Sequence, residues 1–420
     1  MRVVLLCFLG YSAAYLGRVV MPASVLPMQE ALGWTKAELG GVQSCFFVAY
    51  AGGQLASGIL AHFFDPRWSF GLALAGSALL NLLVPLLPTP AAVRTIWLLN
   101  GAVQSLLWCS VVKAMAQRVS ERAMPRAIVA ISSTLSLGTA AAFGSAAVAA
   151  ELRCWQGPFF LAAAALGVSA ALWFAFFRFP EDAAAGGAPH AAAKAYPRAT
   201  RWTGDAAAGR RPARDIALFV ALAALACGAC GFLRDGLQAW SANALRDVFR
   251  LKDSFSILLA LALPLVGILG AFLNKRLHER EPMVFAMTSR SFLAGAALAA
   301  VALFAVRLPS LALAVVAFAG VYLAMVMVTN AITSIFCLAY RRLFDAALVA
   351  GIVDTVCYVG SSFATWSLGR AADVGGWTLV FGLLVVAGVV GTALCVATLR
   401  AERRAAALQP SDEPAVSRTV

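Results

Sequence analysis

Long apolar runs separated by short polar segments repeat along the whole chain. Each run is long enough to cross about 30 Å of hydrocarbon as a helix. The first six lie at about residues 3–28, 39–63, 68–88, 94–116, 126–150 and 157–178. Six more lie at about 215–242, 254–274, 283–306, 309–338, 344–368 and 376–399. The pattern predicts an all-α membrane protein with 12 transmembrane helices in two six-helix halves.

Polar segments divide the chain into domains. Residues 180–213 hold prolines, glycines and basic residues without apolar periodicity, as expected of a flexible linker. The predicted domains are therefore a six-helix bundle over 1–179, a cytoplasmic linker over 180–213, a second bundle over 214–400 and a disordered cytoplasmic tail over 401–420.

Composition and charge agree with this interpretation. The 420 residues are 61% hydrophobic and 13% charged, with a mean hydropathy of +0.82, which excludes an ordinary soluble protein. The net charge of +13 does not require a nucleic-acid partner, because the basic residues gather in alternate loops. We therefore expect the protein in the inner (cytoplasmic) membrane of the cell. The positive-inside rule predicts that both termini are cytoplasmic.

The residue patterns typical of metal sites, ATP-driven pumps and enzymes do not occur in the sequence. The nine cysteines are scattered apart from Cys227 and Cys230, which lie inside an apolar run, and the three histidines fall in or beside predicted cytoplasmic loops. No phosphate-binding G-x-x-x-x-G-K-[ST] sequence occurs. We therefore expect no metal site, no cofactor, no ATP-driven pump and no enzyme.

Two arginines stand inside apolar runs, Arg18 in the first span and Arg234 in the first span after the linker. A charge in the hydrocarbon region is costly and is kept mainly for function. Guanidinium forms bidentate hydrogen bonds with phosphate or carboxylate and stays charged when partly desolvated. The pair predicts an oxyanion ligand, and two guanidinium groups could neutralise a dianion. The alternative is a structural salt bridge with Asp235 or Asp354.

Other polar side chains repeat at helical spacing in the predicted spans. Tyr11, Tyr15 and Arg18 share one helix face, which suggests that they line an aqueous cavity rather than face lipid. Small hydroxyl residues such as Ser136 more often join helices together. The further cavity candidates, together with an acid that could carry a proton, are Gln54, Gln238, Tyr358, Ser136 and Asp354.

Helix caps suggest that the two arginines lie at similar depth. After Arg18 the next helix is predicted to begin at Thr35, where Thr35 and Glu38 form a capping box. After Arg234 the next cap is predicted at Asp253 or Ser254. The two intervals are nearly equal, as in transporters built from repeats.

These motifs resemble a known family. Gly10-Tyr11-x-x-x-Tyr15-x-x-Arg18, Leu233-Arg234-Asp235-Gly236 and Asp354-x-x-x-Tyr358-x-Gly360-Ser361 are similar to organophosphate:phosphate antiporters of the major facilitator superfamily. The resemblance covers nearly the whole chain. It implies that Arg18 and Arg234 clasp the phosphoryl group, that Tyr11 and Tyr15 line the same cavity, and that transport follows a rocker-switch cycle.

Three positions depart from that family. Its glycerol-phosphate members carry a lysine where this chain has Gln54, a histidine where it has Ser136 and a tyrosine where it has Gly231. The changes remove a cation, a titratable group and a phenol. The resemblance therefore supports an anion more strongly than it supports glycerol phosphate.

The preferred hypothesis is a monomeric secondary transporter that exchanges a small phosphorylated metabolite for inorganic phosphate. One alternative is a proton-coupled symporter of a carboxylate such as a sugar acid. Asp354 would be its titrating group, with Asp235 as the second choice. The other is a transporter-like membrane sensor.

Overall fold

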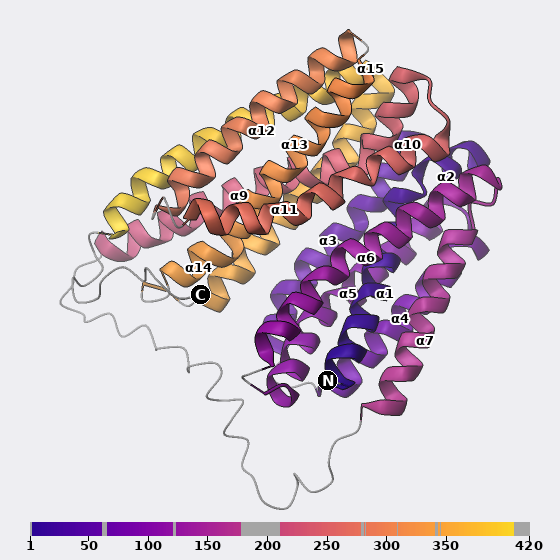
Figure 1. The fold of residues 1–420 in the computed structure, drawn as a ribbon, viewed down its shortest axis with the longest axis horizontal. Helices are drawn as coiled ribbons and strands as arrows, with labels where there is room; N and C mark the ends of the chain where they lie inside the picture. Colours follow the sequence, from indigo (N-terminus) through magenta and orange to yellow (C-terminus); the bar gives the residue numbers. More distant parts are fainter. Residues whose placement is uncertain are drawn as a thin grey trace, which may run out of the picture. The chain divides into compact units, whose positions relative to one another are not determined.

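The computed structural model describes residues 2–60, 65–120, 123–177, 211–278, 281, 283–308, 310–340, 343–344 and 346–406. These residues are almost entirely helical and include no β-strand (Figure 1). The predicted linker lies mostly outside them, although its last residues open a helix at Arg211. At the other end the final helix continues to Ala406, so the first residues of the predicted tail are helical.

The helices coincide with the predicted spans. In the first part of the chain they are α1 (Arg2–Ala23), α2 (Val25–Leu32), α3 (Lys36–Leu60), α4 (Pro66–Leu86), α5 (Pro90–Arg118), α6 (Met124–Glu151) and α7 (Gly157–Phe176). In the second part they are α9 (Arg211–Phe249), α10 (Asp253–Ala260), α11 (Ala262–His278), α12 (Val284–Arg307), α13 (Leu311–Asn330), η2 (Ala331–Phe336), α14 (Cys337–Ala339) and α15 (Ala346–Ala406).

Ten helical stretches of the described chain are long and apolar enough to cross a membrane. One of them, in α15, contains two predicted spans, which are separated at Gly376, where φ is 66°. The predicted second span is α3, outside those ten. The ten stretches, the second span within α15 and α3 together correspond to the 12 spans expected from the sequence. The all-α prediction is confirmed.

Polar caps determine where several helices begin. The predicted capping box is present, since the Thr35 amide donates to Glu38 Oε2 at 2.9 Å and the Glu38 amide donates to Thr35 Oγ1 at 3.1 Å. The cap predicted at Asp253 or Ser254 is wrong by one or two residues. α10 begins at Asp253 after Lys252, which forms no side-chain cap, and the Ser254 hydroxyl donates to Glu151 instead.

The described helices form two compact units. Unit 1 is drawn from residues 1–200, 239–262 and 365–373, and unit 2 from residues 201–238, 263–364 and 374–420. Unit 1 therefore contains α1–α7 together with the last turns of α9, α10 and a short piece of α15. The predicted division into halves at residues 180–213 stays a prediction.

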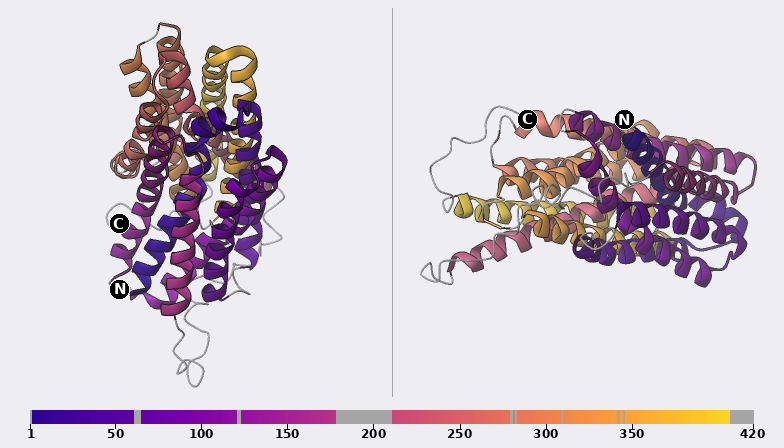
Figure 2. Two further views of the ribbon diagram at one scale, coloured as in Figure 1. Left: turned by 90° about the vertical axis from the view of Figure 1, so that its right-hand side faces the viewer. Right: turned by 90° about the horizontal axis from the view of Figure 1, so that it is seen from below.

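Aromatic packing forms the core of unit 1, in which α1 packs against α6 and α7, and α4 packs against α5 and α7 (indigo to magenta in Figure 2). Phe70 meets Trp173 edge-on at 4.6 Å, and Trp173 stacks on Phe177 at 4.1 Å between ring centroids. The Trp173 indole also donates to the Arg67 carbonyl at 2.9 Å. Buried aromatic pairs of this kind add roughly 1 kcal/mol each beyond their buried area.

In unit 2, the buried carboxylate of Glu402 binds the start of α12. The Glu402 side chain is 0% exposed and accepts from the Val284 amide at 2.8 Å and the Phe285 amide at 2.9 Å. These are the first two amides of α12, whose own N-cap residue, Met283, offers no side-chain bond. The Tyr340 hydroxyl donates to Glu402 as well, at 2.9 Å. An acid on α15 therefore caps α12, where the helix dipole favours negative charge.

We expect Glu402→Ala to lower the stability of the protein by about 2–4 kcal/mol, because it leaves two buried amides and a buried phenol without their acceptor. Thermal unfolding in detergent measures the loss. Glu281→Ala is the matched control, since its ion-pair partner Arg290 is 74% exposed and such pairs contribute little. Equal melting temperatures for the two variants would contradict the capping role.

Candidate functional site

In unit 1, aromatic rings surround the Arg18 guanidinium. Its central carbon lies 4.4 Å from the Tyr50 ring centroid, 5.1 Å from that of Tyr15 and 5.7 Å from that of Phe46. Tyr50 and Phe46 are themselves stacked at 5.7 Å. Cation–π contacts stabilise such a charge by roughly 1–2 kcal/mol each when water is partly excluded. The three rings thus form a cage that stabilises a cation inside an apolar span.

An amide chain behind Arg18 fixes the guanidinium in place. Arg18 Nε donates to Gln104 Oε1 at 3.2 Å, and Gln104 Nε2 donates to Ser77 Oγ at 2.9 Å. Ser77 in turn donates to Asn100 at 2.7 Å, and Asn100 donates to the Gly17 carbonyl at 3.4 Å. Ser77, Asn100 and Gln104 are all 0% exposed. The chain links α4 and α5 to the turn of α1 that carries Arg18.

Three predicted residues join this cluster. Tyr11 contacts Tyr15 edge-on, with ring centroids 5.1 Å apart, so both predicted tyrosines lie on the same face of α1 as Arg18. Gln54 Nε2 donates to the Tyr50 hydroxyl at 3.0 Å and thereby supports the ring beneath Arg18. Ser136 lies half-buried on α6, and the contacts described there do not join it to the cluster.

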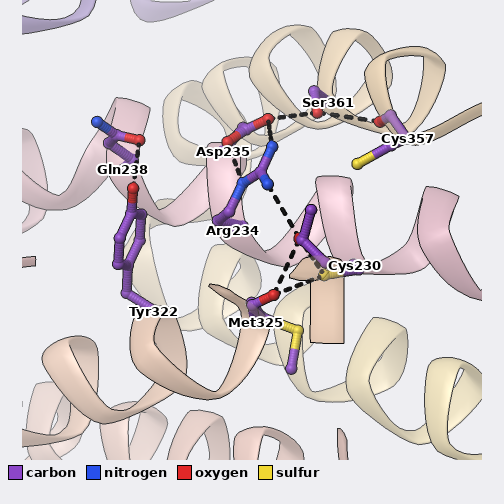
Figure 3. A network of polar contacts seen from close by, with 9 residues as sticks. Cys230, Arg234, Asp235, Gln238, Tyr322, Met325, Cys357 and Ser361 are labelled. Atoms are coloured by element: carbon purple, nitrogen blue, oxygen red, sulfur yellow. Dashed lines mark hydrogen bonds and ion pairs between the residues drawn. The ribbon is translucent and has the colours of Figure 1, made fainter. Parts of the chain in front are cut away.

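In unit 2, Arg234 forms an ion pair with its neighbour along α9. Arg234 Nε donates to Asp235 Oδ1 at 2.8 Å and Nη2 donates to Oδ2 at 2.9 Å (Figure 3). Nη1 donates to Thr329 Oγ1 of α13 at 2.9 Å. The side chains of Arg234 and Asp235 remain 16% and 11% exposed. The salt bridge that the sequence offered as an alternative is therefore present, with Asp235 as the partner.

A close crossing of two helices brings a hydroxyl to this pair. A Cβ atom on Gly231 of α9 would overlap the Cys357 carbonyl of α15, and one on Gly360 of α15 would overlap the Gly228 carbonyl of α9. The two backbones can approach this closely only because these positions lack side chains. The approach places Ser361 Oγ 2.5 Å from Asp235 Oδ2, to which it donates (Figure 3).

The other predicted residues of unit 2 lie along the same helices. Gln238 Oε1 accepts from the Tyr322 hydroxyl at 3.3 Å, one turn beyond Arg234. Tyr358 and Asp354 lie on α15, one and two turns before Ser361. A π-helical segment, η2, begins two residues after Thr329. Such segments occur often at functional sites.

Sequence reasoning missed Gln104 and Thr329, which bind the two arginines directly. A usable signal was present for Gln104. Asn100 and Gln104 are four residues apart in an apolar span, as are Ser77 and Asn81 in the preceding one, so each pair shares a helix face. Thr329 gave no such signal, because a threonine in a membrane helix commonly bonds its own backbone.

At one end of unit 1, the last turns of α9 and the part of α15 just before Gly376 contact α2 and α3. Lys36 Nζ lies 3.1 Å from Asp247 Oδ2, and the Ala37 amide donates to Asp373 Oδ2 at 2.8 Å. Asn243 Nδ2 donates to Gln29 Oε1 at 3.1 Å. These contacts join segments far apart in the sequence, and we call them the α3–α9 seal.

Comparison with known proteins identifies the family of this chain. Residues 6–365 match the Major Facilitator Superfamily. The chain belongs to that superfamily. Its relatives and structural neighbours are transporters rather than enzymes, and the chain is a multi-pass membrane protein.

Among curated proteins, the chain is similar to plant anion transporters. It is 27% identical to probable anion transporter 4, chloroplastic, of Oryza sativa subsp. japonica, over 42% of this chain and 29% of that one. It is 34% identical to sodium-dependent phosphate transport protein 1, chloroplastic, of Arabidopsis thaliana, over 20% of this chain and 16% of that one. The chain thus spans less than a third of these relatives' length.

Solved structures share the fold. A bacterial homologue of the human lysosomal transporter Spinster has a TM-score of 0.73 at 14% identity, over 96% of this chain and 98% of that one. The nucleoside transporter NupG has a TM-score of 0.70 at 13% identity, over 96% and 99%. At these identities the likeness establishes the fold and leaves the substrate open.

Proposed function

We propose that the protein is a secondary transporter of a small organic anion, with a phosphorylated metabolite exchanged for inorganic phosphate as the preferred reaction. The observation that carries the proposal is the Arg18 cage, where rings and an amide chain hold a guanidinium inside an apolar span. A cation retained there needs a functional reason. Each half of the chain supplies one such arginine, and the curated relatives are anion and phosphate transporters.

We propose alternating access by the rocker-switch mechanism as the transport cycle. The α3–α9 seal supports it, because ion pairs and hydrogen bonds of modest strength join helix ends that must separate if that end opens. Partly exposed pairs contribute about 1 kcal/mol or less, so they can break within a transport cycle.

We expect Asp247→Asn to loosen the seal, because Asp247 pairs with Lys36 at 3.1 Å and with Arg246 at 2.8 Å. Amides near the start of α3 and the end of α9 should then exchange hydrogen about fivefold faster, as expected for the loss of roughly 1 kcal/mol. Glu281→Gln, which removes a pair whose arginine is 74% exposed, serves as control. Unchanged exchange in Asp247→Asn would argue against the seal as a gate.

A second candidate, proton-coupled uptake of a carboxylate, is favoured by one relative and one contact. The ascorbate transporter, chloroplastic, of Arabidopsis thaliana is 31% identical over 20% of this chain and 16% of that one. The Arg234–Asp235 pair shows that a carboxylate fits this guanidinium. Uptake that requires a pH gradient would favour symport, whereas gradient-independent exchange would favour the preferred reaction.

A thermal-shift screen tests the substrate class. Phosphorylated and carboxylated metabolites are added to the purified protein, and a ligand at 100 times its Kd should stabilise the folded state by about 2.7 kcal/mol. Stabilisation by phosphorylated compounds, lost in Arg18→Ala, is the expected result. Stabilisation by neutral compounds alone would contradict an anion carrier.

The location and assembly follow the same proposal. We place the protein in the inner, cytoplasmic membrane with both termini in the cytoplasm, because the basic residues gather in alternate loops. It acts as a monomer and takes a small anion as its partner. The proposal involves no cofactor and no nucleic acid.

A further inference from the structure

We infer that the Asp235 carboxylate is a resident competitor of the substrate for Arg234, and that it makes this half-site select singly charged over doubly charged oxyanions. The inference rests on the proposed function, because it specifies the substrate class at the same arginine. It also revises the expectation that two arginines neutralise a dianion.

The geometry shows which donors are already used. Asp235 accepts from Nε and Nη2 of Arg234, the bidentate arrangement in which guanidinium best binds carboxylate or phosphate. Nη1 donates to Thr329. Arginine has about five N–H donors, so an incoming anion must share the remaining ones or displace Asp235.

The same contacts determine the net charge that an incoming anion meets at Arg234. The pair contributes one positive and one negative charge, and adjacent positions on α9 keep the carboxylate beside any anion that reaches Arg234. A dianion gains more from the guanidinium than a monoanion does, but it is repelled more strongly by Asp235. Charge interactions at these separations, near a protein surface, are strong enough to change an affinity by about tenfold or more. Asp235 therefore removes the advantage that a bare arginine gives to a dianion.

Ser361 provides a second anchor for the competitor. Its hydroxyl donates to Asp235 Oδ2 at 2.5 Å, and Ser361 as a whole is 0% exposed. When a substrate displaces Asp235 from Arg234, this bond still satisfies one carboxylate oxygen. Phosphate esters lose their second proton near pH 6, so singly and doubly charged forms coexist and a charge filter can discriminate between them.

The test uses two tetrahedral probes of fixed charge, methyl sulfate with one negative charge and sulfate with two. Each is measured as an inhibitor of labelled phosphate uptake into proteoliposomes. Asp235→Asn should raise the affinity for sulfate relative to methyl sulfate by about tenfold or more. Glu281→Gln is the matched control, since it removes one negative charge from unit 2, at an ion pair whose arginine is 74% exposed, without touching the bidentate pair, and it should keep the wild-type ratio. An unchanged ratio in Asp235→Asn, or an equal change in Glu281→Gln, would overturn the inference.

Two further variants cover a folding failure of Asp235→Asn. Asp235→Glu keeps the charge and should keep the wild-type ratio. Ser361→Ala makes Asp235 depend more on Arg234, so both probes should bind several-fold more weakly at an unchanged ratio; tighter binding of both would overturn the inference. If the wild-type protein neither takes up phosphate nor responds to either probe, the proposed function fails. If it responds but the charge ratio ignores Asp235, only this inference fails.

Discussion

Replacing either arginine by lysine is expected to reduce phosphate uptake into proteoliposomes by about 100-fold or more. Lysine keeps the charge but cannot reproduce the planar fork of donors. In Arg18→Lys the ammonium also cannot span Tyr50 and the Gln104 amide together. In Arg234→Lys the two-point contact with Asp235 and the bond to Thr329 cannot all form. Initial rates measured at equal protein content give the comparison.

Arg307→Lys is the control for the arginine variants, because it makes the same substitution at an exposed position at the end of α12. It should transport at the wild-type rate. Full exchange by both Arg18→Lys and Arg234→Lys would disprove the role of the paired arginines in holding the anion.

Gly231→Ala is expected to destabilise unit 2 by about 2–3 kcal/mol and to abolish transport. The new methyl group would overlap the Cys357 carbonyl and crowd Ser361 Oγ, 2.8 Å away, so α9 and α15 must separate. Overpacking of a close helix contact typically destabilises by 1–3 kcal/mol, and backbone overlap lies at the upper end. Separation would also pull Ser361 from Asp235. Thermal unfolding and phosphate uptake measure the two effects.

Gly351→Ala provides the matched control on α15. A Cβ atom there meets nothing within 4 Å, and alanine favours a helix over glycine by about 1 kcal/mol. Its stability should equal or exceed that of the wild type. If Gly231→Ala behaved like Gly351→Ala, the close crossing would not be needed to position Ser361.

Helix positions could be predicted from the sequence because hydrocarbon thickness fixes span length and apolar runs report it directly. The capping box at Thr35 was equally local, since both partners lie within one turn. The start of α10 was misplaced because its polar residues are used elsewhere. Ser254 bonds Glu151, which is distant in the sequence.

The candidate site was predictable only in part. Helical spacing predicted a shared face for Tyr11, Tyr15 and Arg18, and on α1 Tyr11 contacts Tyr15 while Tyr15 contacts Arg18. Spacing could not reveal that Gln104 reaches Arg18 from another helix, nor that Arg234 takes its own neighbour Asp235 in preference to Asp354. Both depend on how helices pack against one another. The tyrosine of the resembling family could not fit at Gly231, for the same reason.

Counterflow of labelled phosphate in proteoliposomes tests the central claim, that this chain carries an oxyanion, most directly. Vesicles loaded with unlabelled phosphate should accumulate external label transiently above equilibrium, and the accumulation should vanish when Arg18 and Arg234 are both replaced by lysine. Saturable binding of phosphate without any counterflow would contradict transport and support a membrane sensor instead.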